Sequence, residues 1–252
     1  RLSHYLREFF GPMRHIGCMN ALTPPIVRSL SHVTDWVFDL DNTLYPRTCN
    51  LFAQIDVRIT QYVMDLTRLD FAEARELQKT YYRDYGTTLN GLMQRHKVDP
   101  DHFLNTVHAI DYTPVEAHPD LVDAIRSLPG RKFILTNGDT GHARSVLRRL
   151  GGDELFEHVH DIRAMTFVPK PHREAYDGFF ATHGIDPNRA VMFDDLEKNL
   201  VVPHEVGMST VQVVASEDFQ HEQVEAWELG RASGPHVHHV TDNLAQFLRE
   251  LP

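Results

Sequence analysis

The sequence predicts an α/β protein with a Rossmann-like core, in which a parallel sheet is covered by helices on both faces, and an all-helical cap inserted after the first core strand. Two observations lead to this prediction. In the second half of the chain, short apolar runs alternate with amphipathic helical segments, which is typical of parallel sheets with right-handed crossovers. Before this region lies a long stretch of helical periodicity that no strand signal interrupts.

The first core strand is predicted over Val33–Leu40, a short apolar run broken by Asp35. It ends in the polar sequence Asp39-Leu40-Asp41-Asn42-Thr43, which indicates a loop at the end of a buried strand. Residues 1–31 show weak periodicity and contain adjacent prolines, so we expect them to form a partly ordered N-terminal extension.

A helical cap is predicted over residues 47–115. Apolar side chains recur there at spacings of three and four, in Ile55, Ile59, Val63 and Leu66 and again in Phe71, Ala74, Leu77 and Tyr81. Two glycines and Asp99-Pro100 divide the stretch into several helices, with Asp99 as the N-cap of one of them.

The remaining core is predicted from residues 32–46 and 116–252. Its elements are expected in the order helix 121–128, strand 132–136, helix 142–150, strand 158–162, helix 173–183, strand 190–193, a helix from 196 and a last strand 210–214. Gly151-Gly152 marks the end of the second of these helices. The alternation implies parallel strands joined by crossovers.

Composition narrows the class of protein. A chain of 252 residues can bury a large core without disulfides, and its two cysteines have no metal-ligand spacing, which favours a reducing compartment and a cytoplasmic location. No apolar run approaches the ~20 residues that span a bilayer, so no membrane association is expected. Only His236, His238 and His239 cluster among the 17 histidines, and we interpret this cluster as a solvated loop.

Reactive side chains follow the predicted strands at the edge where parallel sheets bind ligands. Asp39 and Asp41 follow the first strand, Thr136-Asn137-Gly138 follow the second, and Asp194-Asp195 follow a later one, while Lys170 lies in an intervening loop. Carboxylates that converge on one cleft repel each other unless they share a cation or a proton. Magnesium, which prefers oxygen ligands, is the cation we expect.

These residues, in this order, resemble the four signature motifs of the haloacid dehalogenase superfamily: Asp39-Leu40-Asp41-Asn42-Thr43-Leu44-Tyr45, Thr136-Asn137, Lys170 and Asp194-Asp195. The resemblance covers the chain from about Val33 to Val214. More narrowly, residues 85–92 and Val168-Pro169-Lys170-Pro171 are similar to the pyrimidine 5'-nucleotidase branch.

The resemblance implies a role for each motif residue. Asp39 would be the nucleophile that forms a phospho-aspartyl intermediate, and Asp41 would protonate the leaving oxygen and then activate water. We expect the crowded anionic setting to raise the pKa of Asp41 so that it holds this proton. Thr136 and backbone N–H groups near Asn137 and Gly138 would bind the phosphoryl oxygens, and Lys170 would balance charge.

A magnesium site is implied by the same motifs. Its ligands would be Asp39, the main-chain carbonyl of Asp41, and Asp195, with Asp194 as a further ligand or an outer partner. Asn199 stands where many family members have an acidic residue, and we expect it to orient the site or to contact the metal through water. In the cap, we expect Tyr85, Asn90, Arg95 and His96 to contact a base or sugar, although each could equally pack the cap.

The function predicted from this set is a magnesium-dependent phosphatase of small phosphate monoesters, with a nucleoside 5'-monophosphate as the expected partner. A net charge of −10 argues against a nucleic-acid polymer, since such binding depends on Lys and Arg. Alternatives are a phosphatase of sugar phosphates or phosphoglycolate, a phosphomutase, a catalytically silent binding protein and, least consistent with Lys170, a metal-dependent glycosyltransferase. Asp41 argues against a dehalogenase, which needs no acid for its leaving group. The protein is expected to be a monomer or homodimer.

Overall fold

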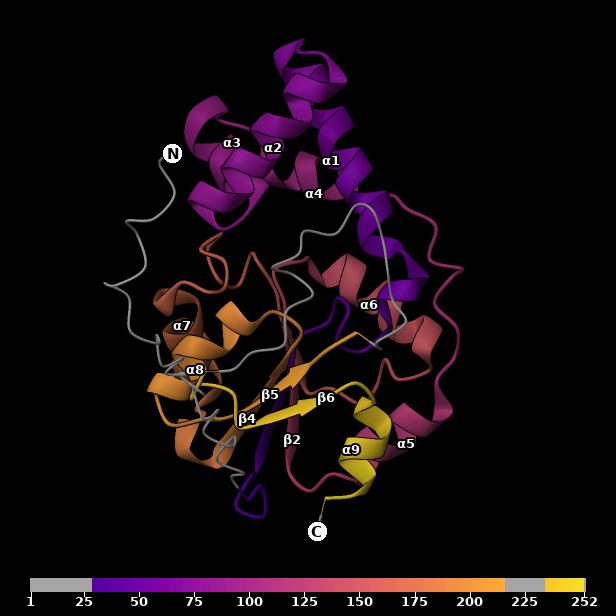
Figure 1. Ribbon diagram of the computed structural model, residues 1–252, viewed down its shortest axis with the longest axis vertical. Helices are drawn as coiled ribbons and strands as arrows, with labels where there is room; N and C mark the ends of the chain where they lie inside the picture. The colour runs from indigo at the N-terminus through magenta and orange to yellow at the C-terminus, as the bar shows by residue number, and fades with distance from the viewer. Residues whose placement is uncertain (1–28, 216–233, 252) are drawn as a thin grey trace, which may run out of the picture.

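The computed structural model describes residues 29–215 and 234–251, and Figure 1 shows a central sheet with helices around it. All strand pairs are parallel, and the strand order is β3-β2-β1-β4-β5-β6. The strands are β1 Asp35–Phe38, β2 Arg131–Leu135, β3 His158–His160, β4 Ala190–Asp194, β5 Ser209–Val213 and β6 His239–Thr241. The predicted Rossmann-like sheet is confirmed, and most of the predicted N-terminal extension lies outside the described residues.

Side chains that alternate along the strands divide the core into two apolar layers. Trp36 and Phe38 of β1 join one layer, and Val37 between them joins the other. The first layer is covered by α5 Pro119–Ser127, α6 Thr140–Leu150 and α9 Leu244–Arg249. The second is covered by α7 Arg173–His183, the 3-10 turn Glu197–Leu200 and α8 Val201–Glu205. Both faces of the sheet are therefore buried, as its apolar strands require.

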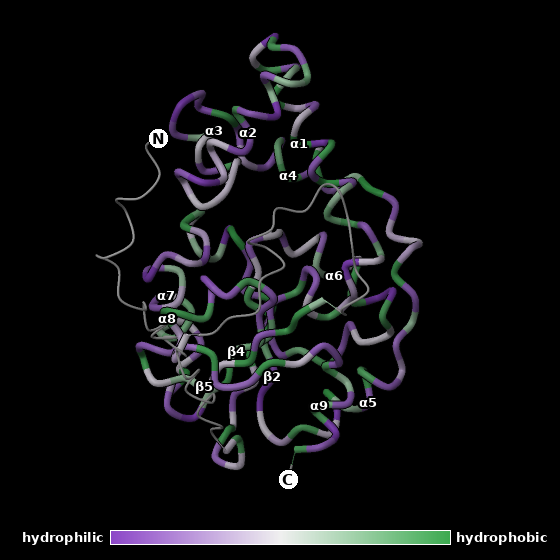
Figure 2. The backbone as a smooth tube through the Cα atoms, in the orientation of Figure 1, coloured by the Kyte–Doolittle hydropathy of each residue, from purple (hydrophilic) through white to green (hydrophobic). Residues whose placement is uncertain are grey.

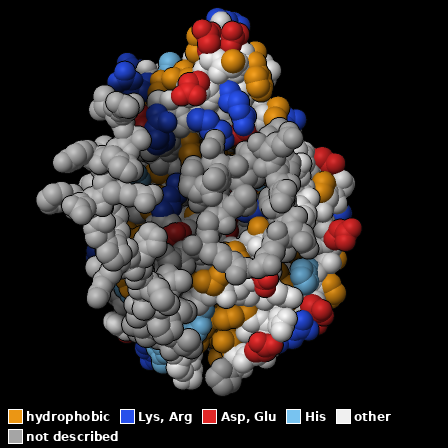
Figure 3. Space-filling model, in the orientation of Figure 1, with side chains coloured by type: hydrophobic (Ala, Val, Ile, Leu, Met, Phe, Trp, Pro, Cys, Tyr) orange, Lys and Arg blue, Asp and Glu red, His pale blue; other side chains and the backbone are white. Residues whose placement is uncertain are grey.

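Between β1 and α5 the chain forms a layer of helices, which lies above the sheet in Figure 1. The helices are α1 Leu51–Thr67, α2 Phe71–Tyr85, α3 Thr88–His96 and α4 Pro100–Val107. Their starts follow local chemistry: Asp70 and Glu73 form a capping box on α2, and Asp99 caps α4 as predicted. Figure 2 shows hydrophobic and hydrophilic residues alternating along these helices, as expected for helices with one buried face. We refer to these helices as the cap, which forms the top of the view in Figure 3.

The last part of the sheet differs from the prediction, which ended at one strand near residues 210–214. A sixth strand and helix α9 follow. The prediction of a solvated histidine loop is wrong, because His239 lies in β6 and His238 is buried beside β5. Thr210 donates its backbone N–H to Nδ1 of His238 at 3.1 Å, and the N–H of His238 donates to Oγ1 of Thr210 at 3.1 Å. None of the described helices is long and apolar enough to cross a membrane.

Candidate active site

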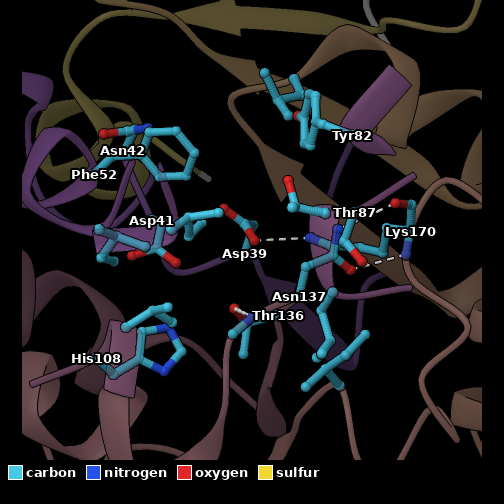
Figure 4. Close-up of a pocket in the computed structure, with 18 of the residues that line it drawn as sticks. Asp39, Asp41, Asn42, Phe52, Tyr82, Thr87, His108, Thr136, Asn137 and Lys170 are labelled. Carbon is cyan, nitrogen blue, oxygen red and sulfur yellow. Dashed lines mark hydrogen bonds and ion pairs between the residues drawn. The ribbon is translucent and has the colours of Figure 1, made fainter. Parts of the chain in front are cut away.

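Three neighbouring strands end at the site, which Figure 4 shows in close-up. Because β1 lies between β2 and β4, the residues that follow these strands come together: Asp39 after β1, Thr136 after β2, and Asp195 after β4. The backbone continues the sheet pattern here, since the N–H of Asp39 donates to the carbonyl of Phe193 at 2.8 Å. Sheet pairing therefore fixes the position of the predicted nucleophile.

Lys170 lies at the centre of the site and is 1% exposed. Its Nζ donates to Oδ1 of Asp39 at 2.8 Å and to Oδ2 of Asp194 at 2.7 Å. Asn137 holds the backbone of Lys170 on both sides: its Oδ1 accepts the N–H at 2.8 Å, and its Nδ2 donates to the carbonyl at 3.1 Å. Asn137 thus positions Lys170, a function that the sequence analysis did not anticipate.

The carboxylates of Asp39, Asp194 and Asp195 offer oxygen atoms within 4.8 Å of one another, and all three are buried. Burial raises the pKa of Asp39 to about 7, even though Lys170 opposes this rise. Burial also raises the pKa of Asp195 well above its ordinary range. An all-oxygen set with excess buried negative charge is the donor set that suits Mg²⁺. The residues present therefore fit the predicted cation.

The two aspartates after β4 have different surroundings. Oδ1 of Asp194 accepts the N–H of Leu196 at 3.0 Å and Nδ2 of Asn199 at 2.9 Å, while its Oδ2 faces Lys170. Both of its oxygens are thus engaged, and Asn199 orients it. Asp195 instead contacts Arg47, whose Nη2 lies 2.5 Å from Oδ2. Arg47 belongs to a 3-10 turn, Arg47–Cys49, on the way into the cap, and the sequence analysis missed it.

Asp41 is held by two donors to a single oxygen. Oδ1 accepts a hydrogen bond from the hydroxyl of Tyr45 at 2.5 Å and lies 2.7 Å from Nε2 of His142. Burial favours the neutral acid, but the charge and hydrogen bond of His142 outweigh it and hold the pKa of Asp41 below its ordinary value. The prediction of a raised pKa is wrong, because this basic partner, 101 residues further along the chain, was not foreseen.

The predicted cap contacts do not reach the cavity. Asn90 donates to the carbonyl of Tyr85 at 3.0 Å and closes the turn between α2 and α3. Nε2 of His96 lies 2.9 Å from the hydroxyl of Tyr81, and both Arg95 and His96 are exposed at the end of α3. The cap residues that line the cavity include Phe52, Ile59, Tyr82, Thr87, Leu89, Phe103 and Leu104.

The cavity has a volume of about 170 Å³ and lies between the cap and the sheet. Its core side contains Asp39, Asp41, Thr136 and Lys170, and its cap side is largely apolar. In Figure 4, Phe52 and Tyr82 stand on one side of Asp39, opposite His108. A ligand in this cavity would meet reactive polar groups at one end and an apolar wall at the other.

Comparison with known proteins agrees with this geometry. A profile of the haloacid dehalogenase-like hydrolases matches residues 37–200, and the chain belongs to this family. Phosphate metabolism protein 8 of Saccharomyces cerevisiae is 26% identical over 202 residues, which cover 73% of this chain and 62% of the yeast protein. The chain thus spans less than two thirds of that relative.

Solved structures share the fold. A HAD phosphatase from Thermococcus onnurineus superimposes with a TM-score of 0.56 at 16% identity, over 86% of this chain and 97% of that one. The L-2-haloacid dehalogenase PA0810 gives a TM-score of 0.55 at 14% identity, over 87% and 100% of the two chains. The magnesium-bound HAD-hydrolase YfnB from Bacillus subtilis gives 0.52 at 12% identity, over 87% and 98%.

Proposed function

We propose that this hydrolase is a magnesium-dependent phosphatase that releases phosphate from nucleoside 5'-monophosphates through a phospho-aspartyl intermediate. The observation that carries the proposal is the pairing of two carboxylates on one cavity. Asp39 is buried against the ammonium of Lys170, and Asp41, two residues further on, is partly exposed to the same cavity. A displacement at carbon would need only the first, whereas a phosphate ester also needs an acid for its leaving oxygen.

The proposed reaction has two displacements at phosphorus. In the first, an oxygen of Asp39 forms a bond to phosphorus while the ester P–O bond breaks, and the leaving oxygen takes, through Asp41, the proton that the Asp41–His142 pair holds. In the second, water attacks phosphorus, Asp41 takes a proton from it, and the bond to Asp39 breaks to release phosphate. Lys170 balances charge on Asp39 throughout.

Thr136 completes the groups proposed for binding the phosphoryl oxygens. It lines the cavity, and its Oγ1 accepts the N–H of Gly138 at 3.0 Å, which leaves its own hydroxyl proton to be donated. Asp39 and Asp195 would hold Mg²⁺, with the carbonyl of Asp41, while Asp194 supports them from outside. When bound, this ion would neutralise charge on the transferring phosphoryl group.

The walls of the cavity support a nucleoside as the leaving group. Among the described lining residues, the only Lys and Arg are Lys170 and Arg47, and each contacts a carboxylate. A substrate with a second anionic group, such as phosphoglycolate, would find no Lys or Arg of helices α1–α4 among the described residues that line the cavity. An aromatic base would instead bury apolar surface against Phe52 and its neighbours.

The comparisons are consistent with this proposal. One structural neighbour is described as a phosphatase and another as magnesium-bound, and the yeast relative is described as a protein of phosphate metabolism.

A panel of monoesters tests the proposal. We expect phosphate release from UMP, CMP and p-nitrophenyl phosphate with Mg²⁺, loss of release with EDTA, and slower release from phosphoglycolate and sugar phosphates. The Asp39→Asn variant should fold and release nothing detectable. Release of phosphate from none of these esters would instead favour a binding protein without turnover. Activity near wild type in Asp39→Asn would refute the assignment of the nucleophile.

A further inference from the structure

Asp41 has two chemically distinct oxygens in this structure. Oδ1 lies 2.7 Å from Nε2 of His142 and 2.5 Å from the hydroxyl of Tyr45. Oδ2 has neither of these partners and lies toward the cavity end of β2, where a Cβ added to Gly138 would stand 3.7 Å from it. A carboxylate whose one oxygen is anchored presents the other in a fixed direction. That second oxygen is the one available to a leaving group.

His142 is itself immobilised. It is 1% exposed in the first turn of α6, and its N–H donates to the N-cap Asp139 at 2.7 Å. On the far side of the ring, Nδ1 lies 3.0 Å from the hydroxyl of Tyr112. The ring of His108 stacks on it with centroids 4.6 Å apart and planes 16° apart. Packing and hydrogen bonds therefore fix the ring that fixes Asp41.

We infer that His142 is a positioning residue for the proposed phosphatase reaction: it holds Oδ1 of Asp41 so that Oδ2 exchanges protons with the leaving oxygen and then with water. The inference rests on the proposed function. A purely structural role, in which His142 only fills space under α6, makes a different prediction. It would make every substitution of similar size equally harmful, whatever atom the new side chain placed near Asp41.

Two amide variants distinguish a positioning role of His142 from a purely structural one, because each variant places an amide nitrogen near the position of one ring nitrogen. His142→Gln places an amide nitrogen near the position of Nε2, so it can still donate to Asp41. His142→Asn places its amide near the position of Nδ1, so it keeps a partner for Tyr112 and loses the contact with Asp41. Both introduce one buried amide, and their melting temperatures report whether either variant is generally disrupted.

The leaving group supplies a second test that packing alone would not affect. Nucleoside alkoxide needs a proton as it leaves, whereas p-nitrophenolate does not. We expect His142→Asn to lower kcat on UMP on the order of 10²-fold, with KM changed little, and His142→Gln to stay within about 10-fold of wild type. The initial burst of p-nitrophenol from p-nitrophenyl phosphate should be nearly unchanged in both. If the Asn variant does not fold, Tyr45→Phe removes the other bond to Oδ1 and takes its place.

Equal losses in the Gln and Asn variants, equal losses on both substrates, or a loss confined to KM would each overturn the inference. A measurement that needs no turnover distinguishes failure of the His142 inference from failure of the proposed function. The Nε2–H proton of His142, identified by its absence in the Gln variant, should give a downfield NMR signal that moves upfield in Asp41→Ala. A wild-type protein with no activity would refute the phosphatase alone, whereas an Nε2–H signal that Asp41→Ala leaves unmoved would refute the contact.

Discussion

Asp39 illustrates how burial competes with charge at a single residue. Burial raises its pKa to about 7, against the opposing charge of Lys170. In the unfolded chain the same carboxyl releases its proton near pH 4. Between these values the folded state binds more protons than the unfolded state, so the free energy of unfolding falls as pH rises through this window. Above pH 7, without a metal ion, the protein carries an ionised carboxylate at an energetic disadvantage.

Replacing Asp39 by Asn should therefore stabilise the metal-free protein at pH 8. Asn resembles the neutral acid, and Lys170 keeps its contact with Asp194. We expect a gain of about 1–3 kcal/mol, or ~3–10 °C in melting temperature, at pH 8. Near pH 4 the variant and the wild type should have the same melting temperature. Scanning calorimetry in EDTA at both pH values measures this, and a variant less stable at pH 8 would contradict it.

Arg47 should compete with the metal ion, because its guanidinium contacts Oδ2 of Asp195 at 2.5 Å and the two side chains are only 9% and 6% exposed. Arg47→Met keeps an unbranched apolar side chain and removes the competing charge. We expect Mg²⁺ to bind ~5- to 30-fold more tightly, a gain of about 1–2 kcal/mol. Titration calorimetry gives the dissociation constant without turnover. An unchanged or weaker affinity would show that Arg47 does not occupy the place of the metal.

At the residue scale, the sequence was informative for side chains that directly follow a predicted strand. Asp39, Thr136 and Asp195 could be expected at one edge of the sheet because each lies at the end of a predicted parallel strand, and the observed strand order makes them neighbours. His142 could not be assigned a partner, because its contact with Asp41 depends on how α6 is rotated against the loop after β1. No local pattern encodes that rotation, which packing in the first apolar layer determines.

At the scale of elements, the contact between β3 and α7 should make the fold sensitive to acid. His160 of β3 lies 3.0 Å from His183 at the end of α7, and burial lowers the pKa of His160 to about 4. The unfolded state therefore binds more protons between about pH 4 and 6.5, and stability is lost as pH falls through this range. In His160→Leu this loss should be smaller. Urea unfolding of both proteins at pH 7 and 4.5 measures the difference, and parallel losses would contradict the prediction.

The two missed elements, β6 and α9, differ in how much local signal the sequence contains. β6 has three residues, His239, Val240 and Thr241, and such a segment becomes a strand only by pairing with β5. Helix α9 did have a local signal, since Asn243 caps it by accepting the N–H of Gln246 at 3.0 Å. Long helices of the cap were predictable because their periodicity extends over many residues. A three-residue strand such as β6 depends on pairing with its neighbour, which local sequence patterns do not contain.

At the scale of the whole molecule, the cap and the sheet share the cavity while touching through few charged contacts. Arg163 beside the sheet lies 2.8 Å from Asp101 of α4, and Nζ of Lys198 lies 4.6 Å above the ring centre of Tyr82 of α2. The first pair is largely exposed, so it holds the cap only weakly. Which cap residues face the cavity is decided by this docking. For this reason the sequence predicted which residues lie together at the strand ends, but not which cap residues line the cavity.

The core side of the cavity is polar and its cap side is largely apolar. This difference can be tested with two substrates that differ only in the group expected to contact the cap side. Ribose 5-phosphate presents the same phosphate and sugar as UMP but lacks the base. Phe52 of α1 lines the cavity and is 38% exposed. Its truncation therefore removes a contact on the cap side of the cavity and should change the stability of the protein little. We expect Phe52→Ala to lower kcat/KM for UMP on the order of 10-fold, the value of about 1–1.5 kcal/mol of aromatic contact, and to leave ribose 5-phosphate nearly unchanged. Equal losses on UMP and ribose 5-phosphate would show that the base does not contact Phe52, because only a contact made by the base can affect the two substrates differently.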